Sequence, residues 1–161
     1  MAVDRGTVRM PRQETLLPKL FSMLSKGGVL AVQVPCTQDM PIHTELEKLI
    51  STDAWKNRFA DMTSAYSTHT VDFYYRILCG LTAEIDLWET QYFHIMNSHA
   101  DIVKWYSGSG LRPYLDCLQD SSAQAEFIQE YESALENVYP LQPDGRILFP
   151  FTRIFFIAKN I

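Results

Sequence analysis

Hydrophobic residues follow two different spacings near the start of the chain. Leucines recur three to four residues apart from Leu16 to Leu24, which predicts a helix. Residues 27–35 (GGVLAVQVP) begin with two glycines, continue as an apolar run and end at a proline, as a buried strand does. Residues 1–12 are polar and show neither pattern. We therefore expect the chain to begin inside a βαβ unit, with a helix and its second strand but no strand before them.

Two helices are expected in the next part of the chain. Thr44 and Glu47 have the spacing of a capping box and predict a helix that begins at Thr44 or one residue earlier and runs to about Phe59. Residues 62–70 are rich in serine and threonine and are expected to form a connector. Residues 71–81 have the pattern of a short helix that ends at a glycine.

A strong strand pattern covers residues 85–96, with aromatic residues on both faces. A helix is expected to follow, from Ser98 through Trp105. Residues 111–118 (LRPYLDCL) are expected to be extended or turn-like. Residues 121–139 have the spacing of an amphipathic helix that is capped by one of the two serines at its start.

The last hydrophobic segment, residues 146–158 (RILFPFTRIFFIA), predicts a final strand. Pro150 cannot donate to a strand ladder, so regular pairing is expected to begin after it or to be bulged there. The expected order is helix, strand, two helices, strand, two helices, strand, with no internal repeat. This order predicts an α/β fold.

Composition limits the partners and the location. The chain has 161 residues and a net charge of -5, without the cluster of Lys and Arg that nucleic-acid binding requires. It has no apolar run near the ~20 residues of a membrane span and no apolar signal core at its start. Cys36, Cys79 and Cys117 lie far apart, so neither a disulfide framework nor a paired metal site is expected. We expect one cytoplasmic domain that binds neither nucleic acid nor a membrane.

Three groups of segments carry a resemblance to a known family. The first is residues 27–35 with Pro41 and His43, which keep the spacing from a strand-end proline to a Pro-x-His. The other two are residues 86–94 (DLWETQYFH) with 100–105 (ADIVKW) and 110–115 (GLRPYL), and residues 139–140 (YP) with 144–153 (DGRILFPFTR). Over residues 16–159 the chain resembles the C-terminal half of the trans-aconitate 2-methyltransferases, which are class I S-adenosylmethionine-dependent methyltransferases.

The resemblance implies an α/β fold: the C-terminal part of a Rossmann-like methyltransferase sheet, with one parallel strand, a terminal antiparallel hairpin and helical insertions, and without the N-terminal cofactor-binding half. It divides one truncated domain, residues 1–161, into an atypical N-terminal segment (1–15), a core helix and strand (16–35), helical acceptor-side insertions (36–82 and 97–145) and a terminal strand pair (83–96 and 146–159). The strand at residues 29–34 would then lack a neighbour. Such an unpaired apolar edge favours self-association.

The resemblance also implies S-adenosylmethionine as the cofactor of the full-length proteins, held by a glycine-rich loop after the first strand. The glycines of this chain form no G-x-G-x-x-G pattern. The nearest approach, residues 108–110 (GSG), follows a helix instead of a strand. We therefore expect no cofactor-binding residues here and no S-adenosylmethionine binding by this chain alone.

The acceptor of the family is a small carboxylic acid, which is ionised at neutral pH and needs little acid–base catalysis. Methyl transfer to it depends on alignment and on a dry pocket. Arginines, with tyrosine or histidine donors, suit a tricarboxylate. By motif position the expected substrate-binding residues are His43, Tyr74, Tyr75, Arg76, Tyr92, His94, Arg112 and Arg153, with Arg146 as a further candidate. No catalytic residue and no metal ligand is expected.

Each of these residue types also has a purely structural interpretation. The structural alternatives are a helix start (His43), core packing (Tyr74 and Tyr75), a hydrogen-bonded packing histidine (His94), a fixed turn (Arg112) and a structural ion pair (Arg153).

Three functions compete on the sequence alone. The first is that the chain is the acceptor-binding half of a trans-aconitate methyltransferase and is inactive by itself. Alternatively, it is a non-catalytic binding or assembly module that pairs with a separate N-terminal half or with itself. An independent small fold with an unrelated activity ranks last, because no second motif supports it.

Overall fold

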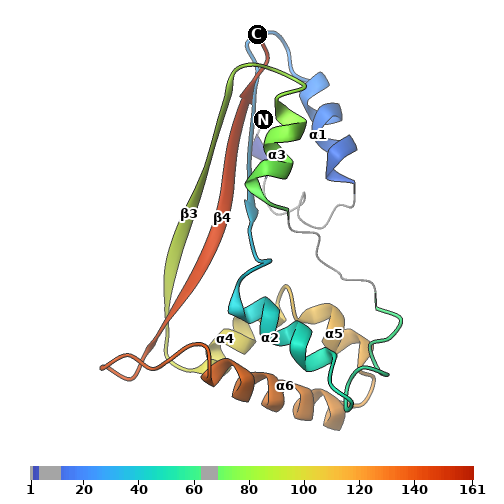
Figure 1. Cartoon of the computed structure of the whole chain (residues 1–161), viewed down its shortest axis with the longest axis vertical. Helices are drawn as coiled ribbons and strands as arrows, with labels where there is room; N and C mark the ends of the chain where they lie inside the picture. The colour runs from blue at the N-terminus through green and yellow to red at the C-terminus, as the bar shows by residue number, and fades with distance from the viewer. Residues whose placement is uncertain (1, 4–11, 63–68) are drawn as a thin grey trace. The chain divides into compact units, whose positions relative to one another are not determined.

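The computed structural model describes residues 2–3, 12–62 and 69–161 (Figure 1). In chain order the elements are β1 (Ala2–Val3), α1 (Gln13–Ser22), β2 (Val29–Pro35), α2 (Pro41–Ile50), α3 (Val71–Leu78), β3 (Ile85–Met96), α4 (His99–Ser107), α5 (Arg112–Cys117), α6 (Ser121–Glu136) and β4 (Ile147–Lys159). They form two compact units, described separately below. The first comprises the described residues of Met1–Thr37, Tyr66–Tyr92 and Phe151–Ile161, and the second those of Gln38–Ala65 and Phe93–Pro150.

The strands join in one sheet in the order β1-β2-β4-β3. β2 runs antiparallel to β4, from the pair Val29 and Lys159 to the pair Pro35 and Arg153. On its other side β2 is paired in parallel with β1, at Ala31 and Val32. Two expectations are therefore wrong: a strand does precede α1, and the strand at residues 29–34 is not an unpaired edge at Ala31 and Val32. The sequence does not reveal β1, because a strand of two residues is too short to show the alternation of polar and apolar positions that predicts a strand.

The core of the first unit lies on one face of this sheet. Side chains of β2 and β4 alternate, and cross-strand pairs such as Val32 with Phe156 and Val34 with Ile154 point to the same face. The helices α1 and α3 cover that face with the side chains of Leu17, Phe21, Tyr74 and Leu78. Figure 1 shows the two helices next to each other on one side of the strands. The α/β class predicted from the sequence is confirmed.

The opposite face of the sheet carries aromatic side chains that remain open to solvent. Trp88 of β3 stacks on Phe155 of β4 with ring centroids 5.3 Å apart and an interplanar angle of 8°. Tyr92 lies 6.4 Å from the same ring. Trp88 and Tyr92 are 40% and 43% exposed. These residues form an aromatic cluster on the outer face of the sheet.

The second unit is helical around an aromatic core. The ring of Phe127 on α6 lies 4.9 Å from Trp55 and 5.2 Å from Phe59, and Phe59 lies 5.7 Å from Tyr114 of α5. The indole N–H of Trp55 donates a 2.7 Å hydrogen bond to Glu130 of α6. These contacts join α5 and α6 to the segment after α2.

The elements α1, β2, α3, β3, α4 and β4 confirm the sequence predictions to within a few residues at each end. The expected helix to Phe59 is wrong in its end: α2 ends at Ile50, and turns follow it. It begins at Pro41, with Met40 as N-cap and no side-chain cap, so the capping box of Thr44 and Glu47 does not form. Pro41 explains the early start, because its fixed φ and missing N–H suit the first helical turn.

Two further predictions need correction. Residues 112–117 are helical instead of extended, since Pro113 stands in the first turn of α5, where a proline is tolerated. The cap of α6 is Asp120, whose carboxylate accepts a 3.0 Å hydrogen bond from the backbone N–H of Ser122. Most of the predicted connector at residues 62–70 lies outside the described residues. None of the helices in the described ranges has the length and apolar character that crossing a bilayer takes.

Candidate functional site

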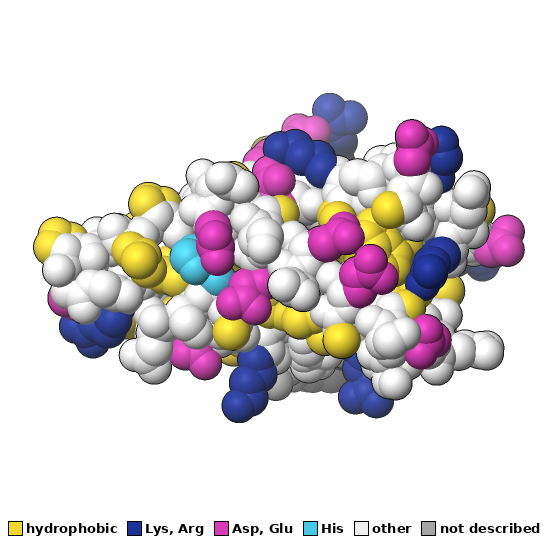
Figure 2. Space-filling model, turned by 90° about the horizontal axis from the view of Figure 1, so that it is seen from below, with side chains coloured by type: hydrophobic (Ala, Val, Ile, Leu, Met, Phe, Trp, Pro, Cys, Tyr) yellow, Lys and Arg dark blue, Asp and Glu magenta, His cyan; other side chains and the backbone are white. Residues whose placement is uncertain are grey.

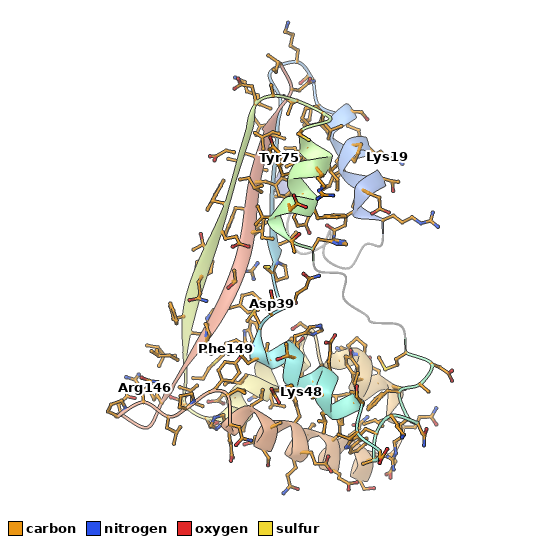
Figure 3. The ribbon with its side chains drawn as sticks, viewed as in Figure 1. Lys19, Asp39, Lys48, Tyr75, Arg146 and Phe149 are labelled. Atoms are coloured by element: carbon orange, nitrogen blue, oxygen red, sulfur yellow. The ribbon has the colours of Figure 1, made fainter. Side chains whose placement is uncertain are left out.

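A connected set of polar contacts lies around His43 at the start of α2, directly after β2. Five residues, 36–40, connect the carboxyl end of β2 to Pro41. Asp39 lies in this connection (Figure 3). Loops that follow the carboxyl ends of parallel strands commonly carry ligand sites in open α/β sheets. The first turn of α2 is therefore the part of the second unit where a site is expected.

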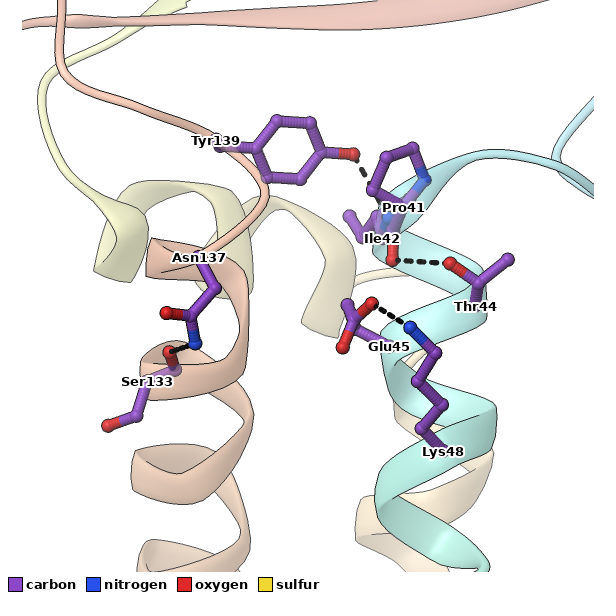
Figure 4. Close-up of polar contacts among 8 residues, drawn as sticks. All are labelled: Pro41, Ile42, Thr44, Glu45, Lys48, Ser133, Asn137 and Tyr139. Carbon is purple, nitrogen blue, oxygen red and sulfur yellow. Dashed lines mark hydrogen bonds and ion pairs between the residues drawn. The ribbon is translucent and has the colours of Figure 1, made fainter.

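Two tyrosine hydroxyl groups hold the peptide groups on either side of Ile42. The backbone N–H of Ile42 donates a 3.0 Å hydrogen bond to the hydroxyl oxygen of Tyr139 (Figure 4). The hydroxyl group of Tyr131, on α6, donates to the carbonyl oxygen of Ile42. A ring nitrogen of His99 lies 2.8 Å from the backbone carbonyl oxygen of Tyr139. We call Tyr131 and Tyr139 the tyrosine clamp.

Both clamp hydroxyls are held in the neutral form by their surroundings. The pKa of Tyr139 is raised to about 12, chiefly by burial; the hydrogen bond with Ile42 lowers it, and the nearby carboxylate of Glu45 adds a smaller increase. Burial also raises the pKa of Tyr131 well above its ordinary value. The clamp therefore keeps its hydrogen-bonding roles throughout the neutral pH range.

His43 follows the clamped residue and is itself almost fully buried, with 8% of its surface exposed. Its Nε2 atom lies 3.1 Å from a carboxylate oxygen of Glu47, one turn further along α2. Its Nδ1 atom has no hydrogen-bond partner. Among the residues described, it is the one buried side-chain nitrogen or oxygen atom that lacks a partner. A buried polar atom without a partner is costly, so its presence calls for an explanation.

The other two candidates of the second unit lie in different surroundings. The ring of His94 is 5.8 Å from that of Trp105 and 6.2 Å from that of Phe149. Arg112 is exposed, and its Nε atom lies 3.5 Å from a carboxylate oxygen of Asp116 on the same helix. His94 thus lies among aromatic rings, and Arg112 forms a surface ion pair.

In the first unit, three candidates come from consecutive positions of α3. Tyr74 points into the core, where its hydroxyl donates a 2.8 Å hydrogen bond to Gln13. Tyr75, the next residue of the helix, is 52% exposed. Arg76 is also exposed and pairs with Asp72 at 2.8 Å.

Tyr75 lines an open groove of about 660 Å³. The rest of its lining comes from α3 and from the start of β3: Val71, Asp72, Ile85, Asp86 and Leu87. Two carboxylates and no cation border the groove, so it does not suit an anionic acceptor.

The last candidates lie on β3 and β4. Tyr92 belongs to the outer aromatic cluster. Arg153 donates a 3.4 Å hydrogen bond to the side-chain oxygen of Gln33 and lies 5.2 Å above the ring of Phe151. The structural ion pair suggested for Arg153 is therefore wrong within the described residues: its partners there are the side-chain amide of Gln33 and the ring of Phe151. Arg146 pairs at 2.7 Å with Asp144, whose pKa is lowered by the hydrogen bonds that it accepts from Arg146.

The candidates thus divide between the two units, and His43 is the one with an unsatisfied buried atom. The tyrosine clamp beside it was not predicted. The available signals were the Tyr-Pro pair at residues 139–140, used only to recognise the family, and the position of Tyr131 on the apolar face of α6. Neither signal identifies Ile42 as the partner, because that contact joins residues 89 and 97 positions apart.

The glycines among the described residues do not follow strands, as those of a methyltransferase cofactor loop would. Two glycines have positive φ, Gly27 and Gly145, and they precede β2 and β4 respectively. A cofactor loop is needed at the carboxyl end of a strand, not at its amino end. No three His, Cys, Asp or Glu side chains in the described ranges gather as metal ligands.

Charges of both signs are interspersed on the molecular surface in Figure 2, around hydrophobic side chains. No continuous basic area is seen on that face. The view thus offers no electrostatic footprint for nucleic acid on this side.

Comparison with known proteins finds sequence relatives that share one name. The chain is 40% identical over 153 residues to a trans-aconitate 2-methyltransferase of Methylobacterium nodulans, a match that covers 94% of this chain and 58% of that protein. It is 36% identical over 149 residues to the trans-aconitate 2-methyltransferase of Paracidovorax citrulli, covering 91% of this chain and 56% of the relative. No family model matches the chain.

Among solved structures, a candidate methyltransferase of Bacillus halodurans overlaps 99% of this chain and 62% of its own, with 11% identity and a TM-score of 0.47. A TM-score of 0.47 is too low to show by itself that the two proteins share a fold. The sequence relationship is much stronger, and it agrees with the resemblance found in the three groups of segments. The chain spans a little over half the length of the curated relatives it matches, and over that length its sequence matches the trans-aconitate 2-methyltransferases.

Proposed function

We propose that this chain is the acceptor-binding part of an S-adenosylmethionine-dependent methyltransferase whose acceptor is a carboxylate of trans-aconitate or a similar small carboxylic acid. The observation that carries the proposal is the 40% identity to a trans-aconitate 2-methyltransferase over 94% of this chain. Because the match covers 94% of the chain, it includes the helices as well as the sheet, which favours a shared acceptor class.

The chain alone is proposed to be catalytically inactive and to bind no S-adenosylmethionine. Support comes from the absence of a G-x-G-x-x-G pattern and from the position of Gly27 and Gly145 before strands instead of after them. We propose that residues 1–161 form part of one cytoplasmic methyltransferase domain, divided into the segments expected from the sequence.

The acceptor would meet the chain through its helical part. His43 is the favoured contact, because it is buried, basic and incompletely hydrogen-bonded. Arg112 and Arg153 remain candidates, since each has guanidinium N–H groups beyond the one that the structure pairs. A buried contact also favours the dry surroundings that methyl transfer to a carboxylate requires.

A chimeric protein tests this proposal. The part of the Methylobacterium nodulans relative that this chain does not match is joined to the full chain, and methyl transfer from S-adenosylmethionine to trans-aconitate is measured. The chimera is expected to form the methyl ester, and the chain alone is not. Calorimetry of the chain alone with S-adenosylmethionine is expected to give no binding heat.

Two results would contradict the proposal in different ways. A folded chimera that binds S-adenosylmethionine but methylates no carboxylic acid would exclude the acceptor class. A micromolar dissociation constant for S-adenosylmethionine with the chain alone would exclude the idea that the chain lacks the cofactor site.

A second candidate function is an assembly module, and one observation favours it. β3 ends the strand order and has 12 residues, and its exposed hydrophobic side chains are Trp88, Tyr92, Phe93 and Ile95, at 40%, 43%, 59% and 58% exposure. A long, apolar end strand favours pairing with another chain. Size-exclusion chromatography at increasing concentration separates the candidates, because a monomer at every concentration would exclude self-association. The strand proposed to pair with another chain is then β3, and not residues 29–34 as expected from the sequence.

A further inference from the structure

We propose that Nδ1 of His43 is the atom that binds a carboxylate of the acceptor, and that Glu47 positions the imidazole for this contact. The inference rests on the proposed function, because it assigns one acceptor contact of that function to a single atom. Three features of the first turn of α2 carry it: a fixed backbone, an oriented ring and an unsatisfied nitrogen.

The backbone before His43 is fixed from both sides. The tyrosine clamp occupies both the N–H and the carbonyl group of Ile42. The N–H of His43 itself donates to the carbonyl oxygen of Met40 at 2.8 Å. Because no backbone N–H of this turn is left for a ligand at these two residues, the side chain of His43 is the group that can bind one.

The ring orientation is fixed by Glu47. A carboxylate oxygen 3.1 Å from Nε2 requires a proton on that nitrogen, because a lone pair facing a carboxylate is repelled. In the neutral ring the proton therefore lies on Nε2, and Nδ1 carries the lone pair. The carboxylate thus acts on the ligand only through the ring, as a positioning group.

Nδ1 is buried and has no partner, which is costly unless something completes the contact. A carboxylate can only accept a hydrogen bond, so its binding at Nδ1 requires a proton there as well. The bound ring is then an imidazolium between two carboxylates, that of Glu47 and that of the ligand. One proton from solvent accompanies the ligand.

The other ionisable groups around this turn do not supply that proton. Glu45 lies on α2 and is paired with Lys48 at 2.6 Å. From the elements packed against the turn, Tyr131 and Tyr139 face Ile42, and burial keeps both hydroxyls neutral. A single ordered water on Nδ1 is the rival explanation of the unpaired atom.

Histidine side-chain NMR of the full chain tests the inference with trans-aconitate as the probe. The ring signals of His43 are identified by their loss in His43→Gln. Without ligand, Nε2 is expected to be protonated and Nδ1 not. On addition of trans-aconitate the Nδ1 signal is expected to move to the protonated range, while His69, His94 and His99 stay unchanged. An unmoved Nδ1, with or without binding elsewhere, overturns the inference in favour of the water.

Two substitutions of His43 separate its nitrogens. Asparagine places a polar group near Nδ1, and glutamine places one near Nε2. His43→Gln is expected to weaken trans-aconitate binding by about tenfold to a hundredfold, as loss of one charge-assisted hydrogen bond does, and His43→Asn clearly less. Lys48→Gln, on the exposed side of α2, is the control and should leave binding unchanged. Equal losses in both His43 variants would contradict an assignment to Nδ1.

The positioning role of Glu47 has a separate readout. In Glu47→Gln the proton of the free ring is expected to distribute over both nitrogens, which the ring 15N shifts report independently of affinity. A ring that keeps its proton on Nε2 in this variant overturns the positioning role.

Failure of this inference is distinguishable from failure of the proposed function. If the chimera methylates trans-aconitate and His43→Gln leaves its KM unchanged, the inference fails and the function stands. If Nδ1 responds to trans-aconitate but the chimera transfers no methyl group, the contact stands and the function fails.

Discussion

The hydroxyl group of Tyr74 donates a 2.8 Å hydrogen bond to the side-chain oxygen of Gln13, and both side chains are buried, with 1% and 2% of their surfaces exposed. The bond joins α3 to the first residue of α1. The ring of Tyr74 also lies 5.2 Å from that of Phe156 in the sheet. One side chain thus ties two helices and the sheet together in the core of the first unit.

Tyr74→Phe is expected to lower the free energy of unfolding by about 1–2 kcal/mol, because it removes a buried donor and leaves the ring contacts intact. Urea unfolding at neutral pH measures the change, with an unchanged m-value. The control is Tyr75→Phe, at the next position of the same helix. Tyr75 is half exposed, so its loss should stay within about 0.5 kcal/mol. Equal losses in the two variants would show that the buried hydrogen bond contributes nothing.

Gly110 gives a second prediction, for the helical unit. A Cβ atom added there would overlap the ring of Tyr106, which is itself buried. Gly110→Ala is therefore expected to lower the unfolding free energy by about 1–3 kcal/mol, as overpacking does. Thermal unfolding followed by near-UV circular dichroism reports the change in this aromatic unit.

Gly108→Ala is the matched control for Gly110. Gly108 caps α4 with φ of -74°, and the nearest atom to an added Cβ is 3.7 Å away. An alanine fits that backbone and that space, so the variant should be neutral or slightly stabilising. A destabilisation as large as that of Gly110→Ala would argue against the clash with Tyr106.

Much of the fold follows from local patterns. β3 is recovered at residues 85–96 because its alternation is long, and α4 because Ser98 caps it with its side chain. α5 was not expected, and it can form because Pro113 stands in its first turn, where a missing N–H breaks no helical hydrogen bond. β1 could not be expected, because it is defined by its backbone pairing with β2 and its two residues show no strand pattern of their own.

The candidate site divides in the same way. His43 was recognisable from its place after a strand and beside Pro41. Its orphaned Nδ1 and the clamp on Ile42 were not, because they depend on tyrosines far along the chain. Long-range hydrogen bonds of this kind have no local period. The sequence therefore indicates which residue to examine, and the packing of α6 against α2 decides what that residue can do.

The bond between Tyr139 and Ile42 can be tested directly. Tyr139→Phe removes the acceptor of the Ile42 N–H, and its exchange with solvent is expected to become about fivefold to tenfold faster. Amide hydrogen exchange followed by NMR measures this rate at Ile42. Tyr92→Phe serves as the control, because Tyr92 is 43% exposed and lies in the other unit. An unchanged exchange rate in Tyr139→Phe would mean that the clamp does not hold this turn.

Alkaline pH gives the last prediction. The pKa of Tyr139 is raised to about 12 in the folded chain, chiefly by burial, against an ordinary value of 10.0. The folded state therefore holds this proton more tightly than the unfolded state does. The resulting stabilisation is fully present below pH 10, and it is lost as the pH rises through about 12. In that window each such tyrosine lowers the unfolding free energy by up to about 1.4 kcal/mol per pH unit.

Burial raises the pKa values of Tyr74 and Tyr131 in the same direction, so the wild-type slope contains several tyrosines. The contribution of Tyr139 is the difference in slope between wild type and Tyr139→Phe, from urea unfolding at a series of pH values above neutrality. The variant should lose stability less steeply above pH 10. Parallel curves would mean that Tyr139 ionises equally in both states, and that its hydroxyl is open to water instead of clamped on Ile42.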